Sequence, residues 1–410
     1  MSIACIRRIA LASAAPFLAV STSLHAQQPV SPRDSAVALR GVKVVAERAE
    51  TKISPVQLTT LPAISSVALP AIQETVNLLD TEDAVKYLPS IFLRKRNYGD
   101  TQATMATRVW GVSSSARSLI FADGVPLTAL IANNNTLGGP RWGLVGPAEI
   151  ARIDMMYGPF SAAYAGNSMG AVMEITTRLP QKREGTVSQT FASQSFDLYG
   201  TRATYPTLQT TADVGDRFGK LAVWLSGNYQ KSESQPLTYV TSGSFPNGTT
   251  GGYAETNKVG AAANVLGAGG LLHTGMTNAR IKLAYDLSPT LRAAYTFGWW
   301  QNDADSHVDT YLTKGGAPSY AGQSGFASGY YNLVQQHSSH SLSLRTDNAN
   351  GDWDYEFVAS RYRFDKDQQR SPSSASGTDT SFSADGKVAV VDGTGWTTLD
   401  AKASWHAGGL

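Results

Sequence analysis

Four short motifs in this 410-residue sequence have residue types or spacings that occur in catalytic or metal sites. The first, Gly166-Asn167-Ser168-Met169-Gly170, fits the Gly-x-Ser-x-Gly pattern of serine hydrolases. That nucleophile needs a strand before it and a helix after it, whereas here a β-prone segment follows at 171–177. We therefore expect the glycines to relieve a tight turn. An exported hydrolase, which would lose activity in Ser168→Ala, is the least favoured function class.

The other three motifs also have a structural interpretation that we favour. His337 and His340 would tend to point to opposite faces of a strand, so we expect surface polar residues rather than metal ligands. The run 302–309 places three carboxylates in a predicted outer loop, but it lacks the glycine and final glutamate of a calcium loop. The segment 215–220 misses phosphate-loop spacing, which excludes a nucleotide site. The sequence thus predicts no catalytic residue, no metal site, no cofactor and no enzyme.

Composition excludes further classes. Hydrophobic residues make up 42% of the chain and charged residues only 16%, below the roughly 25% that is typical of soluble domains. The 34 basic and 32 acidic residues become 32 against 32 without Arg7 and Arg8, the only such charges before residue 27. A neutral chain of this kind is not expected to bind nucleic acid. Cys5 is the only cysteine, so the rest of the chain has no disulfide or thiol nucleophile.

The N-terminus has the pattern of a bacterial export signal at 1–26. Arg7 and Arg8 precede an apolar run at 9–20, and small or polar residues lead to Ala26. Beyond it no stretch approaches the roughly 20 apolar residues of a membrane-spanning helix. If the protein spans a membrane, we expect it to do so with β-strands.

Two regions precede the strand-rich part. Residues 27–75 contain many Pro, Gln, Ser and Thr, which predicts a flexible arm. Inside it, Val42-Lys43-Val44-Val45-Ala46 is a β-prone run that could add to the edge of another protein's sheet or could be an incidental apolar patch. Residues 76–182 predict a compact α/β unit, with a helix capped by Thr81 and stopped by Pro89. Strands are expected at 119–122, 125–127, 150–156 and 171–177, the first two joined by Asp123-Gly124.

From about residue 185 onwards, apolar and polar residues alternate. Ile281, Leu283 and Tyr285, for example, alternate with polar or small neighbours, so one face of each strand is apolar and the opposite face is polar. We count about eight such segments, near residues 185, 200, 218, 277, 290, 337, 352 and 396. Near Val358 the alternation changes phase, which indicates either a bulge or a strand rising above a bilayer.

The connections between these segments alternate in length. Short turns are expected at 213–220, 286–290 and 347–352, and long Gly/Ser/Thr/Asn-rich loops at about 232–275, 303–335 and 367–393. Short and long connections alternate in this way in outer-membrane barrels. Aromatic residues near the short turns are expected to form an interfacial girdle. These residues are Tyr285, Tyr295, Trp353 and Tyr355.

From residue 42 to 410 the chain resembles the TonB-dependent outer-membrane receptors. Within the small unit, residues 119–127 (LIFADGVPL) look like the family's apolar strand, Asp-Gly turn and returning strand. The more specific stretch, 150–159 (IARIDMMYGP), continues through Ser161, Tyr164 and Gly170 to residues 175–177 and resembles the closing motif of the family's plug. The order of signal, arm, small unit and barrel strands is also the order in that family.

The resemblance implies a plug at 76–182 and the N-terminal portion of a β-barrel at 183–410. A wide barrel leaks unless a domain seals it, and TonB would supply energy by gripping residues 42–46 through strand addition. The chain departs from the family by having Tyr157 and Trp110 where arginines usually brace the plug against carboxylates of the wall. We expect Arg108 and Arg152 to substitute for them in part.

The resemblance also implies that plug loops facing the cell exterior bind a scarce polar solute. A ferric siderophore is the leading candidate, and cobalamin, haem, copper and sugars are alternatives within the same family. Each asparagine could equally satisfy its own turn. The matching positions are Arg96, Asn97, Tyr98, Ser114, Ser115, Asn133, Asn134 and Asn135.

We therefore predict an α+β plug followed by antiparallel transmembrane strands of an outer-membrane barrel. The expected partners are TonB with its inner-membrane energising complex, an iron chelate and outer-membrane lipid. We expect a truncated chain, because eight strands are far fewer than the about 22 that enclose a plug. The rival function is a non-transporting surface protein, either an adhesin or a small structural barrel, which predicts no contact between TonB and residues 42–46.

Overall fold

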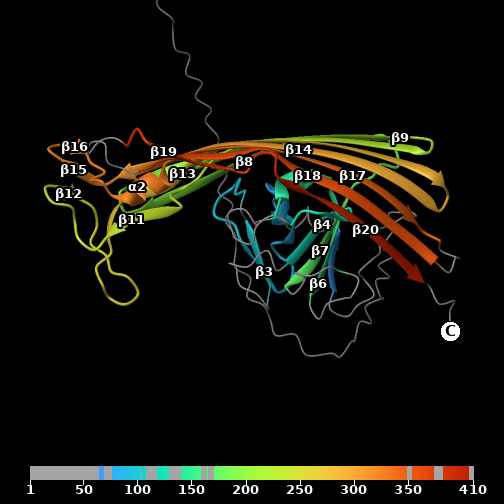
Figure 1. Ribbon diagram of the computed structural model, residues 1–410, viewed down its shortest axis with the longest axis horizontal. Helices are drawn as coiled ribbons and strands as arrows, with labels where there is room; N and C mark the ends of the chain where they lie inside the picture. Colours follow the sequence, from blue (N-terminus) through green and yellow to red (C-terminus); the bar gives the residue numbers. More distant parts are fainter. Residues whose placement is uncertain are drawn as a thin grey trace, which may run out of the picture. The chain divides into compact units, whose positions relative to one another are not determined.

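A computed structural model describes residues 64–68, 76–101, 103–107, 118–128, 140–157, 164, 170–348, 353–373 and 382–405. Within these residues, no helix is long and apolar enough to cross a membrane. We call the described residues from 64 to 177 the plug unit. The sheet built from the long strands after residue 183 is the wall sheet (Figure 1).

The plug unit contains a five-stranded sheet in the order β1-β6-β7-β4-β5, in which β4 and β7 run parallel and the other pairs antiparallel. A separate hairpin pairs β2 with β3. Strand β1 lies inside the region expected to be a flexible arm, because Ile64 to Ala68 pair along β6. The strands are β1 (Ile64–Ala68), β2 (Ile91–Arg94), β3 (Thr104–Thr107), β4 (Ser118–Ala122), β5 (Val125–Pro126), β6 (Ile150–Tyr157) and β7 (Ala171–Thr177).

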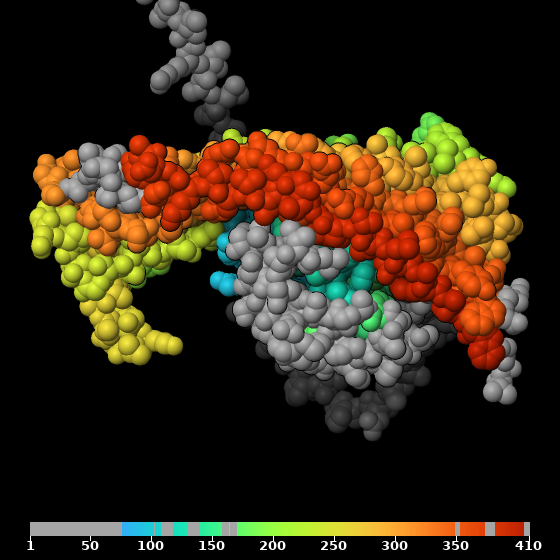
Figure 2. Space-filling view, viewed as in Figure 1, coloured from blue at the N-terminus to red at the C-terminus, as the bar shows by residue number. Residues whose placement is uncertain are grey.

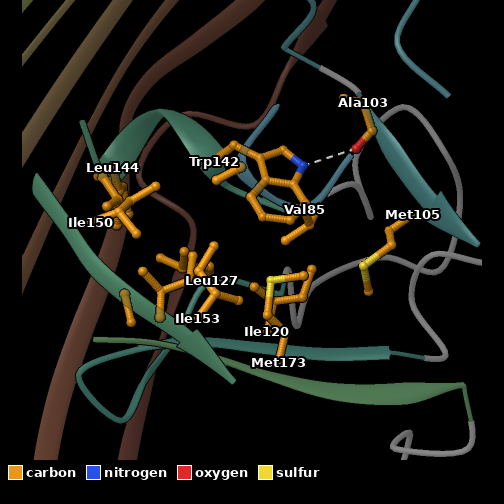
Figure 3. Close-up of a cluster of buried hydrophobic side chains, with 14 of the residues drawn as sticks. Val85, Ala103, Met105, Ile120, Leu127, Trp142, Leu144, Ile150, Ile153 and Met173 are labelled. Atoms are coloured by element: carbon orange, nitrogen blue, oxygen red, sulfur yellow. Dashed lines mark hydrogen bonds between the residues drawn. The ribbon is translucent and has the colours of Figure 1, made fainter. Parts of the chain in front are cut away.

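The core of the plug unit lies between these strands and three short 3-10 helices (Figure 3). Ile120 of β4, Ile153 of β6 and Met173 of β7 have no exposed surface. The indole N–H of Trp142 donates to the carbonyl of Ala103 at 2.9 Å, so the largest core side chain is also satisfied as a donor. The helices are η2 (Thr81–Val85), η4 (Trp142–Leu144) and η5 (Pro147–Glu149).

The helix predicted from Thr81 to the residue before Pro89 is shorter than expected and differently capped. Its N-cap is Asp80, whose backbone N–H donates to the carboxylate of Asp83 at 2.9 Å. Thr81 instead donates its hydroxyl to the carbonyl of Val145, which ties η2 to the segment after η4. The helix ends at Val85, well before Pro89.

All eight predicted strand segments are present in the wall sheet. The strand order is β19-β18-β17-β14-β13-β10-β9-β8, with β11 paired to β13 and β20 paired to β18, and every pair is antiparallel. The strands are β8 (Glu184–Leu198), β9 (Thr201–Phe218), β10 (Leu221–Glu233), β11 (Thr238–Ser242), β13 (Asn264–Ser288), β14 (Leu291–Thr310), β17 (Tyr331–Thr346), β18 (Trp353–Pro372), β19 (Gly386–Val390) and β20 (Gly395–Trp405).

The connections confirm the predicted alternation except at the first hairpin. Short turns join β9 to β10, β13 to β14 and β17 to β18 at one end of the sheet, and longer connections cluster at the other end (Figure 1). At that loop end, β8 and β9 are joined only by Tyr199 and Gly200, where Tyr199 takes a left-handed backbone conformation (φ 53°). The elements within the loops are β12 (Thr250–Gly251), β15 (Leu312–Lys314), β16 (Ala317–Pro318) and α2 (Ser324–Gly329).

Part of one long connection stands out from the surface. In the space-filling view the segment after β11, coloured yellow, projects beyond the neighbouring strands (Figure 2). It contains four glycines with positive φ, Gly248, Gly251, Gly252 and Gly260, which allow the chain to reverse direction in a short length. The loop end thus presents most of the irregular backbone of the described wall sheet.

The two faces of the wall sheet differ as the alternation predicts. Tyr285, Tyr295, Trp353 and Tyr355, which lie close to the short turns, are exposed on its outer face, as an interfacial girdle requires. The opposite face is buried against the plug unit, where the Gln209 amide donates to the carbonyl of Leu79. Polar side chains therefore line the inner face.

The phase change near Val358 is not a bulge at that position. Val358, Tyr362 and Phe364 all lie on the buried face of β18, in unbroken alternation with their neighbours. The register shift occurs further on, between the partners of Phe364 and Lys366. The apolar residues change face because Tyr362 and Phe364 join the core that the wall sheet shares with the plug unit.

The acidic run 302–309 lies in a strand rather than in the predicted outer loop. It forms the end of β14, where Asn302 and Ser306 are buried on the inner face. Asp303, Asp305 and Asp309 alternate with them on the exposed outer face. Within the described residues, no group of three or more His, Cys, Asp or Glu side chains is arranged to hold a metal ion.

Candidate functional site

Asp123 lies at the point where the plug unit meets the inner face of the wall sheet. It forms the β4–β5 turn with Gly124, and positive φ angles of 52° and 80° at the two residues define the tight hairpin that an Asp-Gly pair favours. The turn directs the Asp123 carboxylate toward the end of β7. There the backbone N–H and the hydroxyl of Thr177 donate to it at 3.0 and 2.5 Å.

Two cations of the wall sheet complete the surroundings of this carboxylate. Arg280 and Lys282 occupy successive inward positions of β13 and are both buried. Lys282 Nζ lies 3.0 Å and Arg280 Nη2 3.2 Å from Asp123 Oδ2. Arg280 Nη1 also lies 3.5 Å from Glu149 at the end of η5. One wall strand therefore binds two acidic residues of the plug unit.

A third cation binds the turn itself. Arg345 of β17 donates from Nη2 to the backbone carbonyl of Asp123 at 2.6 Å and to Glu356 of β18 at 2.9 Å. A Cβ atom added to Gly124 would lie 2.8 Å from Arg345 Nη2, so glycine is needed for this approach as well as for the backbone angle. We call Asp123, Glu149, Arg280, Lys282 and Arg345 the latch cluster.

Burial and charge act differently on the carboxyl groups of the plug unit. Burial alone would raise the pKa of Asp123, but Lys282 and Arg280 hold that pKa well below its ordinary range. Burial raises the pKa of Glu174 to about 8, against the opposing effects of Arg345 and of the Gly124 N–H that donates to it at 2.7 Å. Burial also raises the pKa of Glu149, although Arg280 opposes it. Of these three carboxyl groups, Asp123 is therefore the one whose pKa lies below its ordinary value.

The residues at the positions of the family's arginines have other partners. Tyr157 donates its hydroxyl to the carbonyl of Pro89, inside the plug unit. Arg152, expected to substitute for a missing arginine, pairs with Asp154 on its own strand at 2.7 Å. Arg108 and Trp110 lie outside the described residues. In the latch cluster the plug unit supplies the two carboxylates, and the wall sheet supplies the three basic side chains.

Of the predicted solute-binding residues, the structure describes Arg96, Asn97 and Tyr98. Arg96 binds Asp100 through two hydrogen bonds, at 3.0 and 2.6 Å, and Asn97 is buried. The carbonyl of Arg96 accepts from Gln235, just beyond the loop end of β10, so this segment lies at the loop end of the wall sheet. The ring of Tyr98 is 37% exposed. Tyr98 is thus the most exposed of the three, although the side chain of Arg96 is still 33% exposed.

The remaining predicted positions lie outside the described residues. They comprise the export signal at 1–26, Val42-Lys43-Val44-Val45-Ala46 of the TonB-binding segment, and Ser114, Ser115, Asn133, Asn134 and Asn135 of the plug loops. Most of the Gly-x-Ser-x-Gly motif, including Ser168, also lies outside them. These assignments stay predictions.

His337 and His340 face opposite sides of β17, as their spacing predicts. His340 is exposed and contacts the hydroxyl of Tyr295 at 2.8 Å. The expectation of a surface position is wrong for His337, which is fully buried between Tyr362 at 2.7 Å and Asp367 at 3.1 Å. Its burial follows from the core that the wall sheet shares with the plug unit.

The latch cluster is not among the sites that the sequence predicts. Asp123 was expected only as a turn residue, and Arg280 and Lys282 only as polar positions of an alternating strand. A usable signal was present: basic residues at inward positions close to the short turns, namely Arg280, Lys282, Arg292 and Arg345. Buried charges in proteins are normally paired, so such a row implies carboxylates on whatever fills the interior.

Comparisons with known proteins agree with this architecture. The family model of the TonB-dependent receptor plug domain matches residues 57–172. The vitamin B12 transporter BtuB of Vibrio vulnificus is 29% identical over 161 residues, which are 39% of this chain and 23% of that protein. These relatives are named as receptors and transporters, not as enzymes.

Solved structures share the fold at low identity. The ferric enterobactin receptor PfeA of Pseudomonas aeruginosa aligns with a TM-score of 0.51 and 14% identity, over 84% of this chain and 46% of that one. The siderophore receptor PirA of Acinetobacter baumannii aligns with a TM-score of 0.51 and 17% identity, over 80% and 43%. The chain thus spans less than half the length of these relatives. Residues 57–172 thus match the plug domain of the TonB-dependent receptors, and the chain shares the fold of their solved structures, a plug domain followed by antiparallel strands of a β-barrel.

Proposed function

We propose that this chain is part of a transporter that binds a scarce solute, a ferric siderophore, outside the cell and admits it to the periplasm with energy from TonB. The latch cluster is the observation that carries the proposal. It joins the plug unit to the inner face of the wall sheet through ion pairs, a contact that seals a lumen yet can be broken by a pull on the chain. No covalent step is required.

The proposed organisation follows the predicted domains. Residues 1–26 direct export, and residues 27–75 form the periplasmic arm except for β1, which belongs to the plug sheet. Residues 76–182 form the rest of the plug, and residues 183–410 contribute wall strands that cross the outer membrane several times. The exposed apolar side chains on the outer face of β13, β14 and β17 support contact with lipid. Among them are Ile281, Leu283, Tyr295, Leu342 and Leu344.

The named solutes of the relatives support a siderophore. PfeA is described as a ferric enterobactin receptor and PirA as a siderophore receptor, whereas BtuB is named a vitamin B12 transporter. In our proposal Tyr98 meets the solute first, from its exposed position in the plug unit. The contact is extended by Arg96, Asn97, Ser114, Ser115, Asn133, Asn134 and Asn135.

Energy would enter through the β-prone segment 42–46. A strand that adds to the edge of a TonB sheet is held by main-chain hydrogen bonds, so the grip tolerates variation of the side chains. Force applied there would reach the plug unit through β1, which pairs with β6 from Ile64↔Met156 to Ala68↔Arg152. The outer membrane thus needs no energy source of its own.

Uptake measurements test this function. Cells that produce the full gene product are given radiolabelled ferric enterobactin, a labelled ferric hydroxamate and labelled vitamin B12, with and without TonB. We expect uptake of a ferric chelate that disappears without TonB while binding to the cell surface remains. Uptake that is independent of TonB, or binding with no uptake of any probe, would contradict the proposal; the latter result is the one expected of an adhesin.

A further inference from the structure

Two cavities lie between the plug unit and the wall sheet, and both border β13 and β14. The first, of about 50 Å³, touches Asn278 and Trp300 and lies toward the loop end. The second, of about 60 Å³, touches Lys282 and Thr296 and lies toward the short turns. Each has room for several waters. Asn278 and Lys282 share one face of β13 four residues apart, so the cavities follow each other at a spacing of about 13 Å.

The loop-end cavity is lined by amides that lack partners. Gln230 is 1% exposed, yet neither atom of its side-chain amide has a hydrogen-bond partner among the described residues. The same is true, within that part of the chain, of the Oδ1 atoms of Asn228 and Asn278. Buried polar atoms without partners are uncommon and mark places that water or a polar solute occupies.

The turn-end cavity is lined by basic and hydroxyl groups. Lys282, Arg292 and Arg345 border it together with a single carboxylate, that of Asp123. Arg292 also pairs with Asp286 at 2.6 Å, and Arg345 with Glu356 at 2.9 Å. The lining itself is positive, which favours a solute that carries negative charge.

Each of the two strands has one inward residue between the cavities. On β13 it is Arg280, which is held by Asp123 and Glu149. On β14 it is Gly298, where an added Cβ would meet Leu144 of the plug unit at 3.7 Å. On β18 and β20 the plug unit instead meets an aromatic group, in which the rings of Tyr362 and Trp396 stack at 4.3 Å and Tyr362 also borders the loop-end cavity.

We propose that a negatively charged, hydrogen-bonding solute crosses the plug along β13 and β14, from the amide-lined cavity to the basic one, and that Arg280 closes this path at rest. The aromatic contact on β18 and β20 stays in place while the path opens. This inference rests on the proposed transport function and adds the route to it. It differs from a plug that leaves the barrel as a whole, which would use no particular side of the wall.

Filling the basic cavity tests the route. Ala294 borders this cavity, and its neighbour Ala293 lies on the opposite, outer face of β14. In Ala294→Phe the phenyl ring fills this cavity, because a space that holds only a few waters cannot hold the ring and the solute together. We therefore expect uptake of the ferric chelate to fall at least about tenfold. Surface binding should stay within about twofold of the unchanged protein. Ala293→Phe is the matched control and should transport normally.

A second measurement does not depend on the identity of the solute. Ser343 borders the basic cavity, and residues 27–410 contain no other cysteine. We expect Ser343→Cys to react with a negatively charged, membrane-impermeant maleimide only in energised cells that contain TonB. Equal transport by Ala294→Phe and Ala293→Phe, or labelling of Ser343→Cys that energy does not change, would overturn the route. Failure of transport itself would instead appear as absence of uptake in the unchanged protein.

Discussion

Asp123 joins three parts of the molecule that are distant in sequence. Its carboxylate accepts from Thr177 of the plug unit and from Arg280 and Lys282 of the wall, and its backbone carbonyl accepts from Arg345. Removal of one member of a buried ion pair leaves the other charged and without compensation. The side chain of Asp123 therefore contributes more to plug docking than an exposed ion pair of the same length would.

Asp123→Asn tests this contribution. The substituted amide keeps the size of the carboxylate but leaves buried Lys282 without a charged partner and Arg280 with Glu149 alone, so we expect the purified receptor to lose about 3–5 kcal/mol of stability. A urea titration in detergent micelles measures the loss. Asp197 forms an exposed pair with Arg202, and Asp197→Asn should leave the urea midpoint unchanged. Equal effects of the two substitutions would show that the latch cluster contributes nothing specific.

Glu174 predicts a pH dependence of the plug unit. Its pKa rises from an ordinary 4.5 to about 8 on folding because it is buried and close to Glu356 and Asp123. In the window between these values the folded state binds a proton that the unfolded state has released, so stability falls as the pH rises through it. We expect a melting temperature that declines from pH 5 toward pH 8 and a shallower decline in Glu174→Gln. If the melting temperature of Glu174→Gln declined with the same slope, Glu174 would be excluded as the source of the pH dependence.

At the scale of elements, Gly143 of η4 lies directly against the indole of Trp300 on β14. A Cβ atom added to Gly143 would lie 2.4 Å from Nε1 of Trp300, closer than packed atoms approach. Gly143→Ala must therefore push η4 away from the wall, and we expect a loss of about 1–3 kcal/mol from overpacking. Thermal unfolding measures it. In Gly227→Ala the new atom meets its nearest neighbour, the carbonyl of Ala212, at 3.9 Å, so a comparable loss there would refute the packing argument.

The sequence predicted elements better than the contacts between them. Alternation with a period of two located all eight long strands, because one face of each strand is apolar along its length and the other contacts the plug unit. Asp123-Gly124 predicted its turn from the local backbone preference of that pair. The partners of Asp123 lie 157 and 159 residues away, at Arg280 and Lys282. No local pattern encodes a contact of that separation.

The same limit explains the errors. Phe364 looked out of phase because it is an apolar side chain on the otherwise polar inner face. Its burial there depends on packing against the plug unit, which the local sequence of β18 does not show. The run after Asn302 looked like a loop because its composition is polar, yet register with β13 continues through it to Asp309. In both cases tertiary packing overrode the local preference of the residues.

At the scale of the whole molecule, transport requires the plug to be stable at rest and yet movable under load. The ion pairs and the packing of Trp300 against η4 supply the first property. The second depends on the arm before β1, through which TonB would transmit force. The central claim is therefore that residues 42–46 serve as the handle that drives uptake.

Proline at position 44 tests this claim most directly, because it removes a backbone N–H that strand addition needs and leaves the plug and wall untouched. Uptake and surface binding of labelled ferric enterobactin are measured in cells that produce Val44→Pro, Val44→Ala or the unchanged protein. We expect Val44→Pro to bind the chelate normally but to lose energy-dependent uptake, while Val44→Ala transports it. Normal uptake by Val44→Pro would contradict the account.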